Sequence, residues 1–206
     1  MTGYETLASE ETIKRTIDAL QKRGITGISV KTGKEALEKI KALIPSNASV
    51  MNGSSRTLDQ IGFIEYLKSD KHGWRNLHAE ILAEKDPQKQ AVLRKQSVFS
   101  DYYLGSVHAA AETGELVIAS NSGSQLPHLV FTSQNIILVV STQKITPDLD
   151  SALKRVREYV LPLEDQRMKS VGMGGSFISK LLIIEKEQPF MGRKFHVIFV
   201  NEKLGF

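Results

Sequence analysis

Apolar residues recur at helical spacing near the start of the chain, at Ile13, Ile17 and Leu20, between Ser9 and Gly24. A hydroxyl side chain ahead of the first turn and a glycine after the last are typical ends of a helix. The pattern therefore predicts an N-terminal helix over about residues 9–23.

Two later segments show a short apolar run followed by a capped, helical pattern. The predicted strands are 25–30 and 48–52, and the capping patterns run from Thr32 to Glu35 and from Thr57 to Gln60. In such a pattern the hydroxyl and the acidic or amide side chain satisfy the free N–H groups of the first turn. Pro45 ends the first of these helices, and Asp86 with Pro87 predicts another, basic helix over about 87–98.

From residue 102 onward the hydrophobic period becomes that of strands, with one further helix. Strands are predicted at 102–107, 115–119, 136–140, 181–185 and 195–200. The continuous apolar run 136–140 is typical of a buried central strand. Between strands, Thr146 and Pro147 open a helix that Pro162 is expected to end.

Alternating strands and helices predict an α/β fold with a mostly parallel sheet, helices on both faces and an antiparallel portion around 102–119. The chain has 206 residues, of which 41% are hydrophobic, enough for one substantial core. We therefore expect a single domain over residues 1–206, with the N-terminal helix packed on it.

Composition excludes several classes of function. Lys and Arg outnumber Asp and Glu by 27 to 23, a net charge of +4 that suits an anionic small molecule and is too small to indicate nucleic acid. The chain has no cysteine, hence no thiolate chemistry or cysteine-bound cluster of its own. Without a long apolar run or a signal-peptide pattern at the start, the expectation is a cytoplasmic protein with no membrane contact.

Ligands of open α/β sheets bind beyond the carboxyl ends of the strands, where loops offer free N–H groups. Gly53, Ser54, Ser55 and Arg56 follow a predicted strand there: glycine permits close approach, the serines add hydroxyls, and Arg56 can bind a carboxylate or phosphate. An ordinary turn with a helix cap is the competing interpretation. Lys144 emerges near the same edge, either to hold an anionic group or as a solvated lysine.

Other sequence features give weaker evidence for a functional site. The glycine-rich loop 172–175 could form an anion-binding nest, a lid or a plain linker. The histidines lack metal-binding spacing, so we assign no metal and no cofactor, although His108 or His128 could approach the crevice. Glycine fingerprints for dinucleotides and nucleoside triphosphates are missing.

A group of segments carries a resemblance to a known family: residues 106–117, 121–123, 137–140 with Gln143-Lys144-Ile145, 148–159 and 197–206, and with them the serine-rich loop and helix at 52–62. These segments resemble the LUD (lactate utilisation) domain family, which is related to the lactate-utilisation C protein. The resemblance implies a Rossmann-like fold shared with CoA transferases and ribose-phosphate isomerases. It also implies a place beside iron–sulfur partner subunits. The chain departs from the family pattern at Ser141-Thr142-Gln143, where relatives often have glycine and asparagine, and in lacking the cysteine cluster of many members.

Glu112 gains interest from the same resemblance. Its loop, which ends at Gly114, is similar to the turn in which CoA transferases hold a nucleophilic glutamate. The alternative is that Thr113 and Gly114 form a hairpin turn and Glu112 pairs with a neighbour. The leading hypothesis is thus a non-redox LUD-domain protein that binds a small anion (a carboxylate, phosphate or acyl-CoA) through residues 53–56, Glu112, Gly114 and Lys144. An enzyme resembling a CoA transferase or a sugar-phosphate isomerase and using Glu112, a scaffold, and a homodimer stay open.

Overall fold

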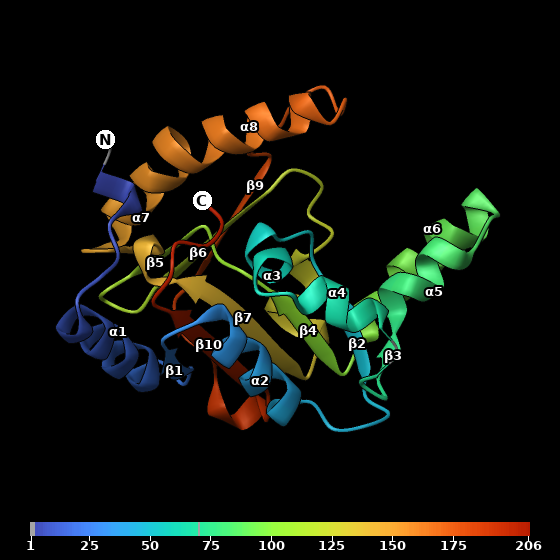
Figure 1. Cartoon of the computed structure of the whole chain (residues 1–206), viewed down its shortest axis with the longest axis horizontal. Helices are drawn as coiled ribbons and strands as arrows, with labels where there is room; N and C mark the ends of the chain where they lie inside the picture. The colour runs from blue at the N-terminus through green and yellow to red at the C-terminus, as the bar shows by residue number, and fades with distance from the viewer. Residues whose placement is uncertain (1–2, 70) are drawn as a thin grey trace.

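The computed structural model describes residues 3–69 and 71–206, and its centre is a six-stranded sheet (Figure 1). The strand order is β1-β10-β7-β4-β2-β3, and all neighbouring strands run parallel. The strands are β1 Thr26–Val30, β2 Ser49–Asn52, β3 Arg75–Asn76, β4 Tyr102–Gly105, β7 Asn135–Ser141 and β10 Lys194–Val200. The predicted parallel sheet is confirmed, with the apolar run 136–140 in an interior strand.

A second sheet of four strands lies beside the first. Its order is β8-β5-β6-β9, with β8 Ile145–Thr146, β5 Ala109–Ala111, β6 Leu116–Ser120 and β9 Lys180–Ile184. The β5–β6 and β6–β9 pairs are antiparallel, whereas β5 and β8 are parallel. The antiparallel portion expected around 102–119 therefore begins after β4 and belongs to this separate sheet. The strands β5 and β8 were not predicted, because runs of two or three residues are too short to show a period.

Helices complete the architecture. They are α1 Glu10–Lys22, α2 Gly33–Leu43, α3 Arg56–Gln60, α4 Phe63–Lys68, α5 Leu77–Ala83, α6 Pro87–Gln96, α7 Leu149–Arg155 and α8 Leu161–Ser170, with short 3₁₀ or π segments η1 Gly3–Glu5, η2 Ser97–Phe99, η3 His128–Thr132, η4 Thr142–Lys144, η5 Val156–Val160 and η6 Pro189–Met191. Figure 1 shows α5 and α6 projecting from the body of the protein at the right and α8 running across the top of the view.

Strand alternation sends side chains of the parallel sheet into two cores. In β7, Ile137 and Val139 join a cluster with residues of α2, α3 and α4, whereas Ile136, Leu138 and Val140 face α1 and the second sheet. The second sheet alternates in the same way, and its outer face packs on α7. One face of the central sheet is thus covered by α2, α3 and α4 and the other by α1 together with the second sheet, so helices lie on both faces as predicted.

Several predicted helix ends are confirmed. The Ser9 side chain accepts the N–H of Thr12 at the start of α1, and Gly24 follows its last turn with φ 75°. The Thr32 hydroxyl caps α2 by accepting the N–H of Glu35. Asp86 likewise caps α6, with Pro87 in its first turn. These signals are local, so they can be recognised from sequence alone.

Two predicted helix boundaries were wrong. The cap of α3 is Ser55, whose Oγ accepts the N–H of Leu58, and Thr57 is instead buried inside the helix. Pro162 does not end the helix begun at α7, which continues through η5 into α8. The π-helical turn of η5 changes the hydrogen-bond register directly before the proline, so the missing N–H of Pro162 falls where the helix can accommodate it.

The carboxyl ends of β2, β4, β7 and β10 lie at one edge of the central sheet because these strands are parallel. Residues 53–55, 106–108, 142–144 and 201–206 continue from those ends. The crevice predicted from strand polarity must therefore form at this edge. Among the residues that the structure describes, no helix has the length and apolar character to cross a membrane.

Candidate functional site

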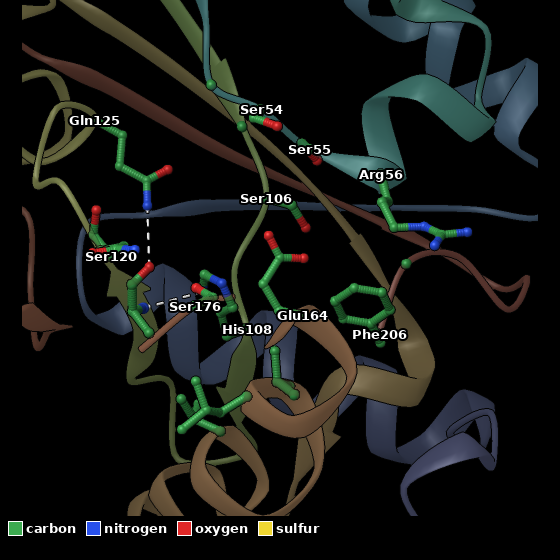
Figure 2. A pocket seen from close by; sticks show the side chains of 18 of the residues that line it. Ser54, Ser55, Arg56, Ser106, His108, Ser120, Gln125, Glu164, Ser176 and Phe206 are labelled. Atoms are coloured by element: carbon green, nitrogen blue, oxygen red, sulfur yellow. Dashed lines mark hydrogen bonds between the residues drawn. The ribbon is translucent and has the colours of Figure 1, made fainter. Parts of the chain in front are cut away.

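A cavity of about 500 Å³ opens at the carboxyl edge of the central sheet. The loops after β2 and β4, together with Lys144 of η4, form its sheet-side wall, and residues of η5, α8 and the following loop form the opposite wall. In Figure 2, Ser54, Ser55 and Arg56 face the cavity from one side, and Glu164 reaches into it from α8. The predicted crevice exists and is open.

The loop 53–56 contributes all four of its predicted residues to the lining. Gly53 is required by its surroundings, since a Cβ at this position would lie 2.4 Å from the Tyr103 hydroxyl. Ser54 and Arg56 are exposed, whereas Ser55 is engaged as the helix cap. The guanidinium of Arg56 lies 5.4 Å from the centre of the Phe206 ring and has no ion-pair partner among the described residues. It is therefore available to an anion.

Lys144 is buried, with 3% of its surface exposed, yet it lines the same cavity. Its Nζ lies 3.1 Å from Thr57 Oγ1, 3.2 Å from Ser106 Oγ and 3.3 Å from the Val107 carbonyl oxygen. Burial, and secondarily the positive charge of Arg155, lowers the pKa of the Lys144 amine to about 7. The prediction that this lysine reaches the crevice is met, whereas a solvated strand-end lysine is not what the structure shows.

Arg155 of α7 is a second buried cation close to the site. Its Nη1 donates to the carbonyl oxygen of His108, and its guanidinium lies 5.1 Å from the Tyr159 ring centre and 6.0 Å from that of Tyr4. Burial lowers the pKa of Arg155 to about 10. Within the described residues neither Arg155 nor Lys144 has a carboxylate partner, so the protein carries uncompensated positive charge behind the cavity wall.

His108 also lines the cavity. Its Nδ1 accepts the backbone N–H of Ala119 at 3.1 Å, which places the proton of the neutral ring on Nε2. Burial, followed by the charges of Lys144 and Arg155, lowers the pKa of His108 to about 3. The ring is therefore a neutral N–H donor over the physiological range.

The opposite wall is largely apolar. Its apolar lining residues are Val156, Val160, Leu161, Met168, Met173, Phe177 and Ile178. Met173 and Phe177 are 65% and 62% exposed, so two large apolar residues of this wall lie open to solvent. A ligand with an apolar portion would cover them.

Glu164 is the carboxylate that α8 brings to the cavity. It forms two hydrogen bonds with Arg167, from Nε at 2.7 Å and from Nη2 at 2.6 Å. Because this pairing offsets its negative charge, Glu164 does not cancel the attraction of the opposite wall for an anion.

Glu112 and Gly114 do not line the cavity, so the expectation that they converge with residues 53–56 and Lys144 was wrong. Glu112 lies next to α1, where Arg15 Nη2 binds its carboxylate at 3.0 Å. Gly114, with φ 101°, forms the β5–β6 hairpin turn, and a Cβ there would lie 2.7 Å from Cδ of Arg23. The turn between the antiparallel strands β5 and β6 therefore lies against α1, and the alternative in which Glu112 pairs with a neighbour beside a hairpin turn is the one that the structure supports.

The glycine-rich loop 172–175 follows α8 and lines the cavity through Met173. The next residue, Ser176, donates its backbone N–H to Asp165 Oδ1 at 2.8 Å. This N–H group is therefore already bound to a carboxylate of the protein and is not free to bind an anionic ligand. His128 lies away from the cavity lining, stacked on Tyr103 and hydrogen-bonded to Ser133 Oγ at 2.8 Å.

Sequence reasoning missed several residues that shape the site. They are Thr57, Ser106, Arg155, Glu164, Gly205 and Phe206. Ser106 directly follows β4, but it was missed because the predicted strand 102–107 extended past the end of β4 and included it. The others reach the cavity through contacts between segments far apart in the chain. Among the described residues, no three His, Asp or Glu side chains gather as metal ligands would.

Comparisons with known proteins agree with this architecture. The model of the LUD domain matches residues 13–200. A search of solved structures finds the crystal structure of a DUF162 family protein from Deinococcus radiodurans, with a TM-score of 0.56 at 15% sequence identity, covering 95% of this chain and 100% of that one. At this identity the likeness concerns the fold. No curated protein matches the sequence.

Proposed function

Because this chain belongs to the LUD domain family, we propose that it binds an organic anion in the cavity as a component of lactate-type organic-acid utilisation. One observation carries the proposal: the sheet-side wall presents Arg56 and Lys144, which have no carboxylate partner among the described residues. An anionic ligand would supply the missing negative charge.

The shape and lining of the cavity also favour one kind of anion. Its volume of about 500 Å³ lies within the range of roughly 300–1,000 Å³ that is usual for ligands of drug size, so a three-carbon acid would leave much of it empty. Exposed Met173 and Phe177 favour a ligand with an apolar portion. We therefore expect a carboxylate with a longer chain or an aromatic group, or an acyl derivative, to bind more tightly than lactate. The open cavity also favours ligand binding over a scaffold without one.

A thermal-shift screen tests this function. The full chain is heated with lactate, hexanoate, phenyllactate, an acyl-CoA and a sugar phosphate. At about 100 times its Kd a ligand stabilises the folded state by about 2.7 kcal/mol, which for a chain of this length raises Tm on the order of 5–10 °C. We expect that rise for hexanoate or phenyllactate and a smaller one for lactate. The Arg56→Ala variant should lose most of it, and Arg94→Ala, an exposed arginine on α6, should keep it.

If the sugar phosphate raises Tm and the carboxylates do not, the ligand is a phosphorylated compound and the proposed carboxylate class is wrong. An unchanged Tm with every compound would contradict ligand binding and favour a scaffold.

We further propose that any electron transfer in this pathway belongs to an iron–sulfur partner. The proposal rests on the family resemblance and on the absence of cysteine from the chain. Anaerobic affinity purification from the native host, followed by iron and sulfide analysis, should recover such a subunit. Purification of the chain without iron under those conditions would count against it.

A further inference from the structure

Ser106 and Lys144 lie next to each other at the cavity. Ser106 follows β4 and lines the cavity with a half-buried side chain, which Figure 2 shows among the cavity residues. Its Oγ has three polar neighbours: Lys144 Nζ at 3.2 Å, the Val107 carbonyl oxygen at 3.3 Å and Thr57 Oγ1 at 3.4 Å. The amine is the only base among these three neighbours, and Ser106 itself is more exposed than any of them.

The partners of Nζ suit a neutral amine. The Val107 carbonyl can only accept a hydrogen bond, whereas the Thr57 and Ser106 hydroxyls can accept or donate. A neutral amine would give its two N–H groups to Val107 and Thr57 and leave its lone pair for the Ser106 hydroxyl. Gly205 packs against the far side, where a Cβ would lie 2.9 Å from Nζ.

Charges around the amine also favour the neutral form. The titratable and charged side chains on the elements around it are Tyr4 and Glu5 of η1, Arg56 of α3, His108, Arg155 of α7, and Glu164 and Arg167 of α8. None of these carboxylates lies within ion-pair distance of Nζ. Burial of the amine is the larger cause of its lowered pKa, and the positive charge of Arg155 acts in the same direction. The pKa of about 7 leaves a substantial neutral fraction at physiological pH.

We propose that Ser106 is a nucleophile and Lys144 its general base, and that the pair transfers the acyl group of an organic-acid ester or thioester to water. The inference uses the same cavity as the proposed function but depends on different atoms. Serine with a lysine base is a recurrent variant of the serine–histidine arrangement, in which the base removes the hydroxyl proton as the nucleophile attacks.

The reaction balances within the site. Ser106 Oγ attacks the carbonyl carbon while its proton passes to Lys144 Nζ, and a tetrahedral oxyanion forms. The C–O or C–S bond to the leaving group then breaks, and the alkoxide or thiolate leaves with the proton from Lys144. Water attacks the resulting acyl-serine, Lys144 accepts its proton and returns it to Ser106 Oγ, and a carboxylic acid is released. His108 supplies the cavity with an N–H donor suited to the oxyanion.

Labelling of the full chain with a fluorophosphonate tests the pair. We expect one covalent adduct, which peptide mass spectrometry locates at Ser106, with a rate that rises with pH through about 7 as Lys144 loses its proton. Ser106→Ala should abolish the adduct, and Lys144→Met should slow its formation by about 100-fold. The matched control is Ser124→Ala, which removes a cavity serine whose hydroxyl pairs with Ser122 and has no lysine partner among the described residues; this variant should label at the wild-type rate. Hydrolysis of p-nitrophenyl hexanoate and of a hexanoyl thioester then shows which acyl donor is used.

A wild-type chain without an adduct at Ser106, or one whose rate is independent of pH, overturns the inference. If Lys144→Met does not fold, the wild-type pH profile and Ser106→Ala still decide. A chain that gains thermal stability from hexanoate but forms no adduct would contradict the reactive pair alone and leave the proposed function intact.

Discussion

Arg155 is bound through Nη1 to the backbone carbonyl of His108, while its Nε and Nη2 are buried without a hydrogen-bond partner in the described part of the chain. A buried guanidinium with two unsatisfied nitrogens is costly, and its charge lowers the pKa of a neighbouring amine. The residue therefore acts on Lys144 from behind the cavity wall.

Replacement of Arg155 by Met should raise the pKa of Lys144 above 7, because the variant removes a positive charge and keeps an apolar side chain of similar length. We expect little loss of stability, since apolar substitutes for buried charges are often neutral or stabilising. Carbon-13 NMR of labelled lysine across pH 6–10 gives the titration midpoint. Arg157→Met, on the exposed side of the same helical segment, is the control and should leave the midpoint unchanged.

The Lys144 amine should also make stability depend on pH. Its pKa is about 7 in the folded chain against 10.5 for an ordinary lysine, so between these values the unfolded chain binds a proton that the folded chain does not. The free energy of unfolding therefore rises with pH from about 7 to about 10.5 and does not change through this group below 7.

Urea unfolding of wild type and Lys144→Met at several values between pH 7.5 and 9.5 measures this dependence. The wild type should gain up to about 1.4 kcal/mol per pH unit relative to the variant. The exposed Lys39→Met should follow the wild type. Parallel pH profiles for wild type and Lys144→Met would show that the buried amine is not depressed.

Gly53→Ala should destabilise the protein, because the added methyl would lie 2.4 Å from the Tyr103 hydroxyl. Overpacking of this kind typically costs about 1–3 kcal/mol. Tyr103→Phe removes that hydroxyl, which has no hydrogen-bond partner among the described residues, and should be near neutral by itself. Denaturant unfolding of both single variants and the double variant forms a cycle, and the double variant should regain most of the loss. If the effects of the two single variants on the free energy of unfolding simply add, the Tyr103 hydroxyl is not the cause of the loss in Gly53→Ala.

Glu112→Gln should have little effect on stability or on the cavity. Its carboxylate is 24% exposed and pairs with Arg15, which is 51% exposed, an arrangement usually worth no more than about 1 kcal/mol. Thermal shift by hexanoate and fluorophosphonate labelling should both match the wild type. If a folded Glu112→Gln chain loses either the thermal shift or the labelling, the Glu112 carboxylate is part of the functional site.

The sequence predicts what is decided locally. Ser9, Thr32 and Asp86 cap helices through side chains only a few positions from the groups they satisfy, and apolar runs mark the long strands. The polarity of parallel strands was enough to place residues 53–56 and Lys144 at one edge. Thr57 shows where local reasoning fails: it fits a capping pattern, but tertiary contact with Lys144 buries it and leaves the cap to Ser55.

The remaining features depend on tertiary structure. The direction of the hairpin at Glu112 follows from a second sheet whose shortest strands have no visible period. Passage of the helix through Pro162 depends on a π-helical turn, for which the sequence has no reliable signature. Arg155 and Gly205 reach the site only once the fold is complete, because neither lies next to it in the chain.

The two walls of the cavity originate in separate parts of the chain. The reactive groups stand on loops fixed to the ends of parallel strands, whereas Met168, Met173 and Phe177 belong to α8 and the loop that follows it. Substitutions in α8 and the loop that follows it could therefore change which ligand the cavity binds without displacing Ser106 or Lys144. Related chains could in this way diverge in substrate while retaining one common reaction centre.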